Sequence, residues 1–158
     1  MKDVASKGLI VGVISDTHGL LRPEAIEALA GTDHILHAGD VGDPGILDRL
    51  RAIAPLTAIR GNVDVSGICS TLPATEAVEL GGKLFYLVHS LRDLDIDATV
   101  AGVSVVVSGH SHRADMQERA GVLYLNPGSA GPRRLDLRVT IATVTLADGT
   151  VRAQIVTL

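Results

Sequence analysis

The sequence predicts an α/β fold, built as a four-layer α-β-β-α sandwich of two mixed sheets flanked by helices. Two observations predict it. Residues 8–61 alternate short apolar runs with amphipathic segments, which is typical of a βαβαβ unit with a parallel sheet. Most of the later chain consists of strand-like runs that flank glycine turns, which indicates β-hairpins. Hairpins added to a βαβ unit favour two facing sheets with helices outside them.

Strands and helices alternate in the first part of the chain. Pro23 and Pro44 each mark the first turn of a helix, where the fixed φ of proline fits and its missing N–H is not needed. The expected elements, in order, are a strand at 8–15, a helix from Pro23 to Gly31, a strand at 33–38, a helix from Asp43-Pro44 to before Pro55, and a strand at 55–61.

The second part is mostly β. Residues 75–80 and 83–88 flank Gly81-Gly82, a strong signal for a two-residue hairpin turn. The other expected elements are a weak helix near 95–101, a buried strand at 103–108, strands at 114–119 and 122–125 around Gly121, and a hairpin of 137–146 and 150–157 around Asp148-Gly149. No linker or repeat divides the chain, so we expect a single domain over 1–158, with 1–7 as a loose N-terminus.

The composition excludes several classes of protein. Of the 158 residues, 46% are hydrophobic and 20% are charged, which supports a packed core and argues against disorder. Aromatic residues make up 2% and the net charge is −4 without a basic stripe, so extended nucleic-acid binding is not expected. The single cysteine, Cys69, excludes an internal disulfide and cysteine-rich zinc sites.

The first apolar stretch, from Leu9 to Ile14, is too short to cross a membrane. Asp16 and His18 end it, and no small-residue cleavage site follows. We therefore expect neither a membrane segment nor a signal peptide, and a cytoplasmic location.

Five apolar runs each end in a residue that can bind a metal. The seven donors are Asp16, His18, Asp40, Asn62, His89, His110 and His112. Open α/β sheets build their sites outside the carboxyl ends of their strands, so these side chains are expected to converge on one rim of one sheet. Seven donors are enough for two metal ions that share a carboxylate, an arrangement used to hydrolyse phosphate esters.

The spacing of the donors suggests how they divide. Asp16 and His18 lie two apart, so in extended backbone both would point to one side and grip one cation. His110 and His112 share this spacing, and the turn between them could direct each to a different ion. Asp40 is the best bridging candidate, because a carboxylate has two oxygens.

The donor types indicate which metals fit. Asn62 offers a neutral oxygen, which limits the negative charge of the set. Mixed imidazole, carboxylate and amide donors suit two divalent transition-metal ions, with manganese expected first and iron, zinc, nickel or cobalt as alternatives. His37, in the same run as Asp40, is a candidate for a supporting or substrate-binding role. Any one of these residues is common in proteins, so the hypothesis of a metal site rests on all seven donors occurring in this order.

The ordered set resembles the calcineurin-like metallophosphoesterase superfamily. The matching motifs are Asp16-Thr17-His18-Gly19, Gly39-Asp40, Gly61-Asn62, His89 and Gly109-His110-Ser111-His112. The short length, with Gly61-Asn62-Val63-Asp64 and Asn126-Pro127-Gly128-Ser129, is most similar to the small bacterial and archaeal phosphodiesterase branch. The resemblance covers about 8–157, which implies a single metallophosphoesterase domain.

The resemblance implies a metal-dependent phosphodiesterase that acts on small phosphodiesters. It implies one metal held by Asp16, His18, Asp40 and His112. It implies a second held by Asp40, Asn62, His89 and His110. A hydroxide that bridges the two metals would attack phosphorus in line with the leaving oxygen.

The chain departs from the family pattern in two places. Many members have a histidine after the asparagine of the third motif, which acts on the leaving group; here that residue is Val63. Asp64 or a water could replace this acid, and otherwise esters with good leaving groups should be preferred. The second departure is Ser90, where the family often has glycine. It could narrow the site, bind a substrate oxygen, or be a tolerated small residue.

Two readings remain for the function. In the enzyme, Asp40, Asn62, His37 and Asp64 are the catalytic candidates. The alternative is a non-catalytic scaffold, because one branch with this fold, the small retromer subunit, serves mainly as a protein-binding platform. Such a protein should have lost ligands, whereas all seven are present here, which favours the enzyme. A homo-oligomer is compatible with the apolar composition.

Overall fold

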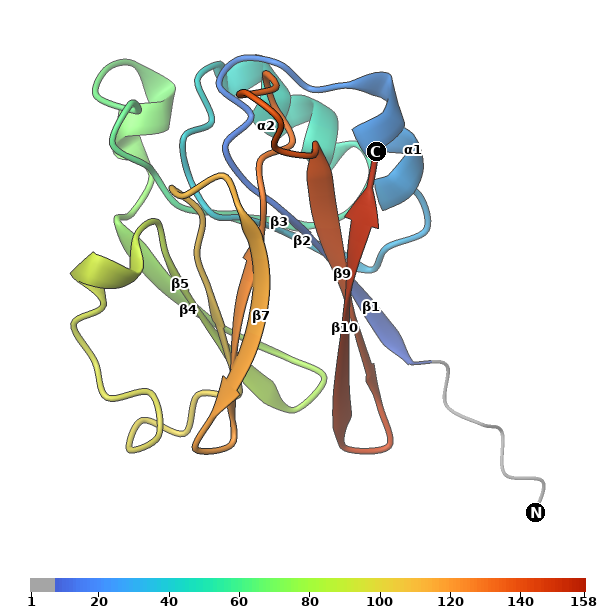
Figure 1. The fold of residues 1–158 in the computed structure, drawn as a ribbon, viewed down its shortest axis with the longest axis vertical. Helices are drawn as coiled ribbons and strands as arrows, with labels where there is room; N and C mark the ends of the chain where they lie inside the picture. Colours follow the sequence, from blue (N-terminus) through green and yellow to red (C-terminus); the bar gives the residue numbers. More distant parts are fainter. Residues whose placement is uncertain (1–7) are drawn as a thin grey trace.

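The computed structural model describes residues 8–158, so the predicted loose terminus at 1–7 lies outside the described residues. Two mixed five-stranded sheets face each other, and in Figure 1 the strands β4, β5 and β7 lie on the left and β1, β9 and β10 on the right. The predicted α/β sandwich is therefore confirmed.

The first sheet has the strand order β10-β9-β1-β2-β3. Its strands are β1 (Leu9–Ile14), β2 (His34–His37), β3 (Leu56–Ala58), β9 (Thr140–Ala147) and β10 (Thr150–Thr157). β1, β2 and β3 are parallel, and β9 runs antiparallel to both β1 and β10. The βαβαβ unit predicted from the first part of the chain is therefore present.

The second sheet has the order β4-β5-β6-β8-β7. Its strands are β4 (Thr75–Leu80), β5 (Lys83–Val88), β6 (Val105–Val107), β7 (Ala114–Arg119) and β8 (Val122–Pro127). β5, β6 and β8 are parallel, whereas β4 and β7 run antiparallel at the two edges. The hairpin around Gly81-Gly82 has the predicted bounds.

Hydrophobic side chains fill the space between the sheets. Val13 and Leu36 of the first sheet pack with Phe85, Val107 and Leu125 of the second, and all five are buried. Each such side chain stabilises the fold by roughly 1.5–3 kcal/mol relative to full exposure.

Two helices, α1 (Pro23–Leu29) and α2 (Pro44–Arg51), cover the other face of the first sheet. Both have proline in the first turn, as predicted. Asp43 Oδ1 accepts a hydrogen bond from Gly45 N at 2.9 Å, so this aspartate caps α2. Among residues 8–158, no helix has both the length and the hydrophobicity needed to cross a membrane.

The predicted helix near 95–101 is wrong. A short 3₁₀ helix, η2 (Leu91–Asp93), is followed by turns. The Asp97 carboxylate accepts from Val100 N at 3.1 Å, a local bond that competes with helical pairing. Leu94 and Ile96 pack on the outer face of the second sheet, so this layer consists of turns instead of a helix.

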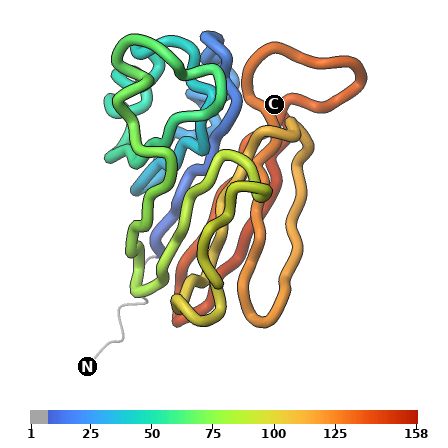
Figure 2. The backbone as a smooth tube through the Cα atoms, turned by 90° about the vertical axis from the view of Figure 1, so that its left-hand side faces the viewer, coloured from blue at the N-terminus to red at the C-terminus, as the bar shows by residue number. Residues whose placement is uncertain are grey.

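Several predicted strands have shifted bounds, and the one expected at 55–61 spans only Leu56–Ala58. The strand expected at 103–108 is shorter, and the one expected at 122–125 continues to Pro127. The strand expected from 137 begins only at Thr140, because the preceding residues form a loop that projects from the molecule, drawn in orange in Figure 2. A second 3₁₀ helix, η1 (Ile68–Thr71), was not predicted.

Candidate metal centre

The seven predicted donors follow the carboxyl ends of five strands, but these strands belong to both sheets. Asp16, His18, Asp40 and Asn62 follow strands of the first sheet, and His89, His110 and His112 follow strands of the second. The expectation of one rim of one sheet is therefore wrong. The two sheets stack with the carboxyl ends of their parallel strands at a common rim, so each sheet supplies part of the site.

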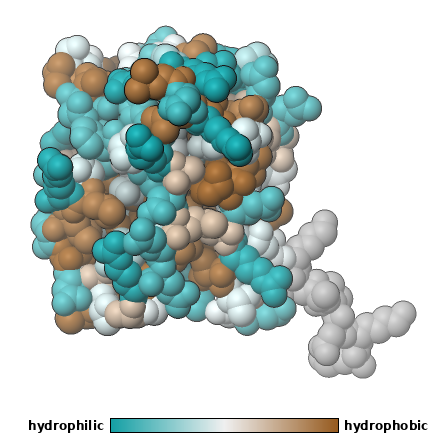
Figure 3. Space-filling model, viewed as in Figure 1, coloured by the Kyte–Doolittle hydropathy of each residue, from teal (hydrophilic) through white to brown (hydrophobic). Residues whose placement is uncertain are grey.

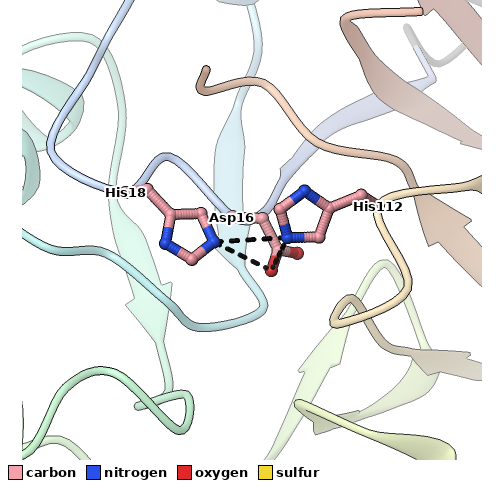
Figure 4. Close-up of side chains that lie close together, drawn as sticks. All are labelled: Asp16, His18 and His112. Atoms are coloured by element: carbon pink, nitrogen blue, oxygen red, sulfur yellow. Dashed lines mark hydrogen bonds and ion pairs between the residues drawn. The ribbon is translucent and has the colours of Figure 1, made fainter. Parts of the chain in front are cut away.

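Asp16, His18 and His112 form the first group of donors (Figure 4). His112 Nε2 lies 3.3 Å from Asp16 Oδ1 and 3.3 Å from His18 Nε2. His18 Nε2 lies 3.7 Å from Asp16 Oδ1. Figure 4 shows the two imidazole rings pointing toward one another over the carboxylate.

Asp16, Asp40 and His89 form the second group. His89 Nε2 lies 3.2 Å from Asp40 Oδ2 and 3.9 Å from Asp16 Oδ1. His89 Nδ1 lies 2.7 Å from the Ala38 carbonyl oxygen, so Nδ1 carries the proton and donates it. In the neutral ring, Nε2 therefore has its lone pair directed at the carboxylates, which is the orientation of a metal ligand.

Asp40 belongs to the second group and also reaches the first. Its Oδ2 is 3.5 Å from His18 Nε2 as well as 3.2 Å from His89 Nε2. Its Oδ1 accepts a hydrogen bond from Val63 N at 3.0 Å, which holds the carboxylate in place. Asp40 is therefore positioned to touch cations on both sides.

Asn62 and His110 stand at the mouth of the site. Asn62 Oδ1 lies 3.2 Å from His110 Nδ1. The His110 ring lies 5.2 Å from the His89 ring, centroid to centroid, and His110 N donates to Asp16 Oδ2 at 3.1 Å. All seven predicted donors are thus brought together.

The donor geometry fits cations. Ligands bound at about 2.0–2.2 Å from one divalent ion lie roughly 3–3.5 Å from one another, which is close to the spacing of these nitrogen and oxygen atoms. Within residues 8–158, Asp16 Oδ1 and His89 Nε2 are buried and have no hydrogen-bond partner. Buried polar atoms without partners are costly, so an ion at this point would satisfy both.

The electrostatics of the pair Asp40–His89 also suit a cation. Burial by itself would raise the pKa of Asp40. Hydrogen bonds with His89 and the Val63 N–H outweigh burial, so the pKa of Asp40 is lowered to about 2. Burial by itself would lower the pKa of His89. Hydrogen bonds with the Asp40 carboxylate and the Ala38 carbonyl outweigh burial, so the pKa of His89 is raised above its usual value. Asp40 is therefore ionised at neutral pH, and a metal would compete with a proton for His89.

The backbone at the donors is left-handed. Five of the seven have positive φ: Asp16 (55°), His18 (45°), Asp40 (56°), His110 (69°) and His112 (63°). The extended backbone predicted for Asp16 and His18 is therefore wrong, and tight turns direct these side chains. Such conformations cost about 1–3 kcal/mol each and cluster at functional sites, where the surrounding structure enforces them.

Glycines let the backbone approach the carboxylates closely. A Cβ at Gly61 would overlap the Asp40 carboxylate, and a Cβ at Gly109 would overlap Ser15 Oγ and Asp16 Oδ2. Glycine, which has no side chain, is therefore what permits this close approach at the two positions.

His37 lies beneath the site and not in it. Its side chain is fully buried, Gly39 N donates to Nδ1 at 3.1 Å, and Nε2 lies 3.0 Å from Thr17 Oγ1. The ring is therefore neutral, with its proton on Nε2. A substrate-binding role for His37 does not fit this burial, whereas a supporting role does, because Thr17 stands between two donors.

Burial lowers the pKa of His37 to about 4. The unfolded chain binds a proton near pH 6.5, whereas the folded chain does not until about pH 4. The contribution of neutral His37 to the free energy of unfolding is therefore fully present above pH 6.5. It is lost as the pH falls to 4, which lowers the free energy of unfolding by about 3 kcal/mol.

We expect His37→Gln to remove this part of the pH dependence. Urea unfolding of metal-free protein between pH 4 and 7 measures it, because chelation eliminates proton competition with metal. Equal pH slopes for the variant and the wild type would contradict the assignment.

Asp64 holds the loops together. Its Oδ2 accepts from Gly61 N at 2.9 Å and Val41 N at 3.1 Å, and its Oδ1 accepts from Gly42 N at 3.0 Å. A carboxylate with both oxygens bound to backbone N–H groups is not free to protonate a leaving group, so the geometry does not support the predicted acid role. Asp64 instead joins the loops after β2 and β3.

Further supporting residues lie behind the donors. Ser15 Oγ donates to Asp16 Oδ2 at 2.6 Å, and Ser129 Oγ donates to the Asp16 carbonyl at 3.0 Å. Asn126 Nδ2 donates to the Gly109 carbonyl at 2.9 Å. The Asn126–Ser129 motif signalled this support in the sequence, whereas nothing in the sequence distinguished Ser15.

A cavity of about 540 Å³ opens beside the second group. Asn62, His89 and His110 line it together with Arg60 and Ser90. Ser90 is therefore placed where a substrate would pass. Arg60 Nη1 donates to the Leu72 carbonyl at 2.7 Å, so its guanidinium is partly engaged.

Comparison with known proteins shows the family to which the sequence is similar. The model of the calcineurin-like phosphoesterase superfamily domain matches residues 9–149. A probable metallophosphoesterase of Methanocaldococcus jannaschii is 34% identical over 143 residues, covering 82% of this chain and 72% of the relative.

Two solved structures are alike in fold. Vacuolar protein sorting 29 of Cryptosporidium parvum has a TM-score of 0.78 at 21% identity, covering 96% of this chain and 98% of that one. An archaeal phosphodiesterase has a TM-score of 0.77 at 23% identity, covering 93% and 99%.

The matched residues include every strand of the two sheets except β10, and all seven predicted donors, from Asp16 to His112. The family match, the relative and the shared rim of carboxylates and imidazoles agree with one another. The chain therefore belongs to the calcineurin-like phosphoesterase superfamily.

Proposed function

We propose that the chain is a metal-dependent phosphodiesterase that hydrolyses small phosphodiesters, and that residues 1–158 act as one domain. One observation carries the proposal: two donor groups share the Asp16 carboxylate, and buried nitrogen and oxygen atoms in them lack partners. The archaeal phosphodiesterase of the same fold supports the choice of diesters.

The proposed metals are two divalent transition-metal ions, with manganese first. The proposed ligands of one are Asp16, His18, Asp40 and His112. The proposed ligands of the other are Asp40, Asn62, His89 and His110. Asp40 is the proposed bridge, because one of its oxygens lies near histidines of both sets.

The metals would supply an activated water and would offset the charge on the phosphoryl oxygens. The residues of the chain supply the charge and the fixed geometry of the site. Asp16 and Asp40 are buried and bring negative charge to the centre, while the supporting hydrogen bonds fix their orientation. Asn62 and His110 stand where the substrate enters beside the cavity of Arg60.

The residue at position 63 affects which phosphodiesters can be cleaved, because it does not protonate the leaving group. The Val63 side chain is 43% exposed and cannot transfer a proton, and its N–H is engaged with Asp40. With Asp64 committed to backbone contacts, neither Val63 nor Asp64 can protonate the leaving group. A general acid contributes about 10²–10⁴-fold to rate.

We expect p-nitrophenyl diesters to be cleaved about 10²-fold or more faster than dialkyl diesters, because an aryl oxide needs no proton to leave. Initial rates on matched aryl and alkyl diesters measure this difference. Equal rates would show that another proton donor operates.

The proposed function is tested with bis-p-nitrophenyl phosphate beside p-nitrophenyl phosphate, each with added Mn²⁺ and after chelation. Diester cleavage that requires the metal supports the proposal. A protein that binds metal at these residues but cleaves neither ester contradicts it.

The likeness to vacuolar protein sorting 29 favours a second candidate, a scaffold of the same fold. Val65 is 79% exposed and Ile68 is 64% exposed in the loop after Asn62, where a partner could pack. Metal content after purification without chelator separates the candidates, because a scaffold does not require metal in stoichiometric amounts.

A further inference from the structure

The sandwich is open along one side, between the edge strands β7 and β10. These strands end their respective sheets, and Figure 1 shows them facing each other across the front of the molecule. Two cavities follow one another along them. One of about 560 Å³ is lined by Met116, Val151 and Ala153, and one of about 380 Å³ by Ala114 and Ile155. We call the two together the β7–β10 groove.

Alternation along the strands gives the groove an apolar floor, while polar residues, among them Lys83, Glu118 and Thr150, border the larger cavity. Ala114 and Met116 share one face of β7, and Val151, Ala153 and Ile155 share one face of β10. The three β10 residues are half-buried and pack against the central core, so the core itself is open to solvent here. In Figure 3, hydrophobic atoms lie between hydrophilic borders on this face.

The groove reaches the metal centre at one end. His112, a donor of the first group, lines the same cavity as Ile155. Arg113 and Arg138 also line that end, and both are exposed. The groove therefore joins a cationic entrance beside the donors to an apolar channel that leads away from them.

A ligand that fits this arrangement has an anionic head and an apolar tail. We propose that the β7–β10 groove binds the apolar ester arm of the substrate while its phosphodiester lies at the donor rim, so the substrate class is a phosphodiester with an alkyl chain. This inference rests on the proposed function. Water adds its oxygen to phosphorus, the bond from phosphorus to the leaving oxygen breaks, that oxygen takes a proton, and the alkyl arm stays on the monoester product.

A series of p-nitrophenyl alkyl phosphodiesters, from methyl to octyl, tests the groove. Each methylene that enters it should raise kcat/KM by about threefold. Ala153→Trp fills the channel and should make kcat/KM independent of chain length. Gln154→Trp, on the opposite face of β10, is the matched control and should keep the dependence.

Binding without turnover provides a second readout. Protein loaded with diamagnetic Zn²⁺ is titrated with methyl octyl phosphate, below the concentration at which it aggregates, while methyl resonances are followed by NMR. The expected result is a shift of the Met116, Val151 and Ile155 methyls, with an affinity that rises with chain length.

The outcomes separate the two proposals. Hydrolysis that is independent of chain length, with no shift of groove methyls, overturns the groove and leaves the proposed function standing. Groove shifts without turnover of any diester support the groove as a binding site and contradict the hydrolytic function. Rates that rise with chain length in the wild type and in Gln154→Trp, together with groove shifts, support both.

Discussion

Replacing Asp40 with asparagine is expected to lower metal-dependent diester hydrolysis by at least about 10²–10³-fold and to lower metal content. One Asp40 oxygen lies near His18 on one side and His89 on the other. Asparagine removes the negative charge and leaves a single neutral oxygen, so two cations would no longer share a carboxylate. Metal analysis by mass spectrometry and kcat/KM on an aryl diester measure the effect.

Asp43→Asn is the matched control, because it makes the same chemical change three residues away. Asp43 caps α2, and asparagine caps helices about as well as aspartate. The control should keep both metal and activity. Full metal content and full activity in Asp40→Asn would refute the bridging assignment.

Replacing Asp64 with alanine is expected to lower the free energy of unfolding by about 3 kcal/mol, because the buried Val41 N–H loses its acceptor and two partly buried N–H groups lose a hydrogen bond to a charged group, at about 1–3 kcal/mol each. The acceptor joins Val41, Gly42 and Gly61. In a chain of this length, that loss corresponds to a Tm lower by about 6–12 °C. Thermal and urea unfolding of metal-free protein measure it.

Asp48→Ala controls for the loss of an acidic side chain. Asp48 pairs only with exposed Arg51 at 3.5 Å, and such pairs contribute about 0–1 kcal/mol. Asp64→Asn retains one acceptor oxygen and should fall between the wild type and Asp64→Ala. Unchanged stability in Asp64→Ala would show that other contacts hold these loops.

Local signals predicted most of the fold. Gly81-Gly82 placed a hairpin at the correct residues, and proline marked the start of both helices, because these residues restrict the backbone wherever they occur. The segment 95–101 was predicted wrongly, since its apolar spacing suits a helix but Asp97 bonds to its own backbone.

The donors could be found in the sequence because each follows an apolar strand, and strand ends form the sites of α/β sheets. Their roles were harder to predict. His37 and Asp64 look like catalytic residues by type and position, yet both are buried in contacts with the backbone of neighbouring loops. Their further contacts, of His37 with Thr17 and of Asp64 with Val41 and Gly42, join segments that are distant in sequence, so no local pattern reports them.

The sequence by itself determined the class of fold and the order of the seven candidate donors along the chain, because strand periodicity and side-chain chemistry are local properties. Only the tertiary structure decided that two sheets share one rim and that left-handed turns aim the donors. It also decided that the β7–β10 side stays open beside His112. These features depend on how the two sheets stack, which is set by the packing of side chains from both sheets in one core.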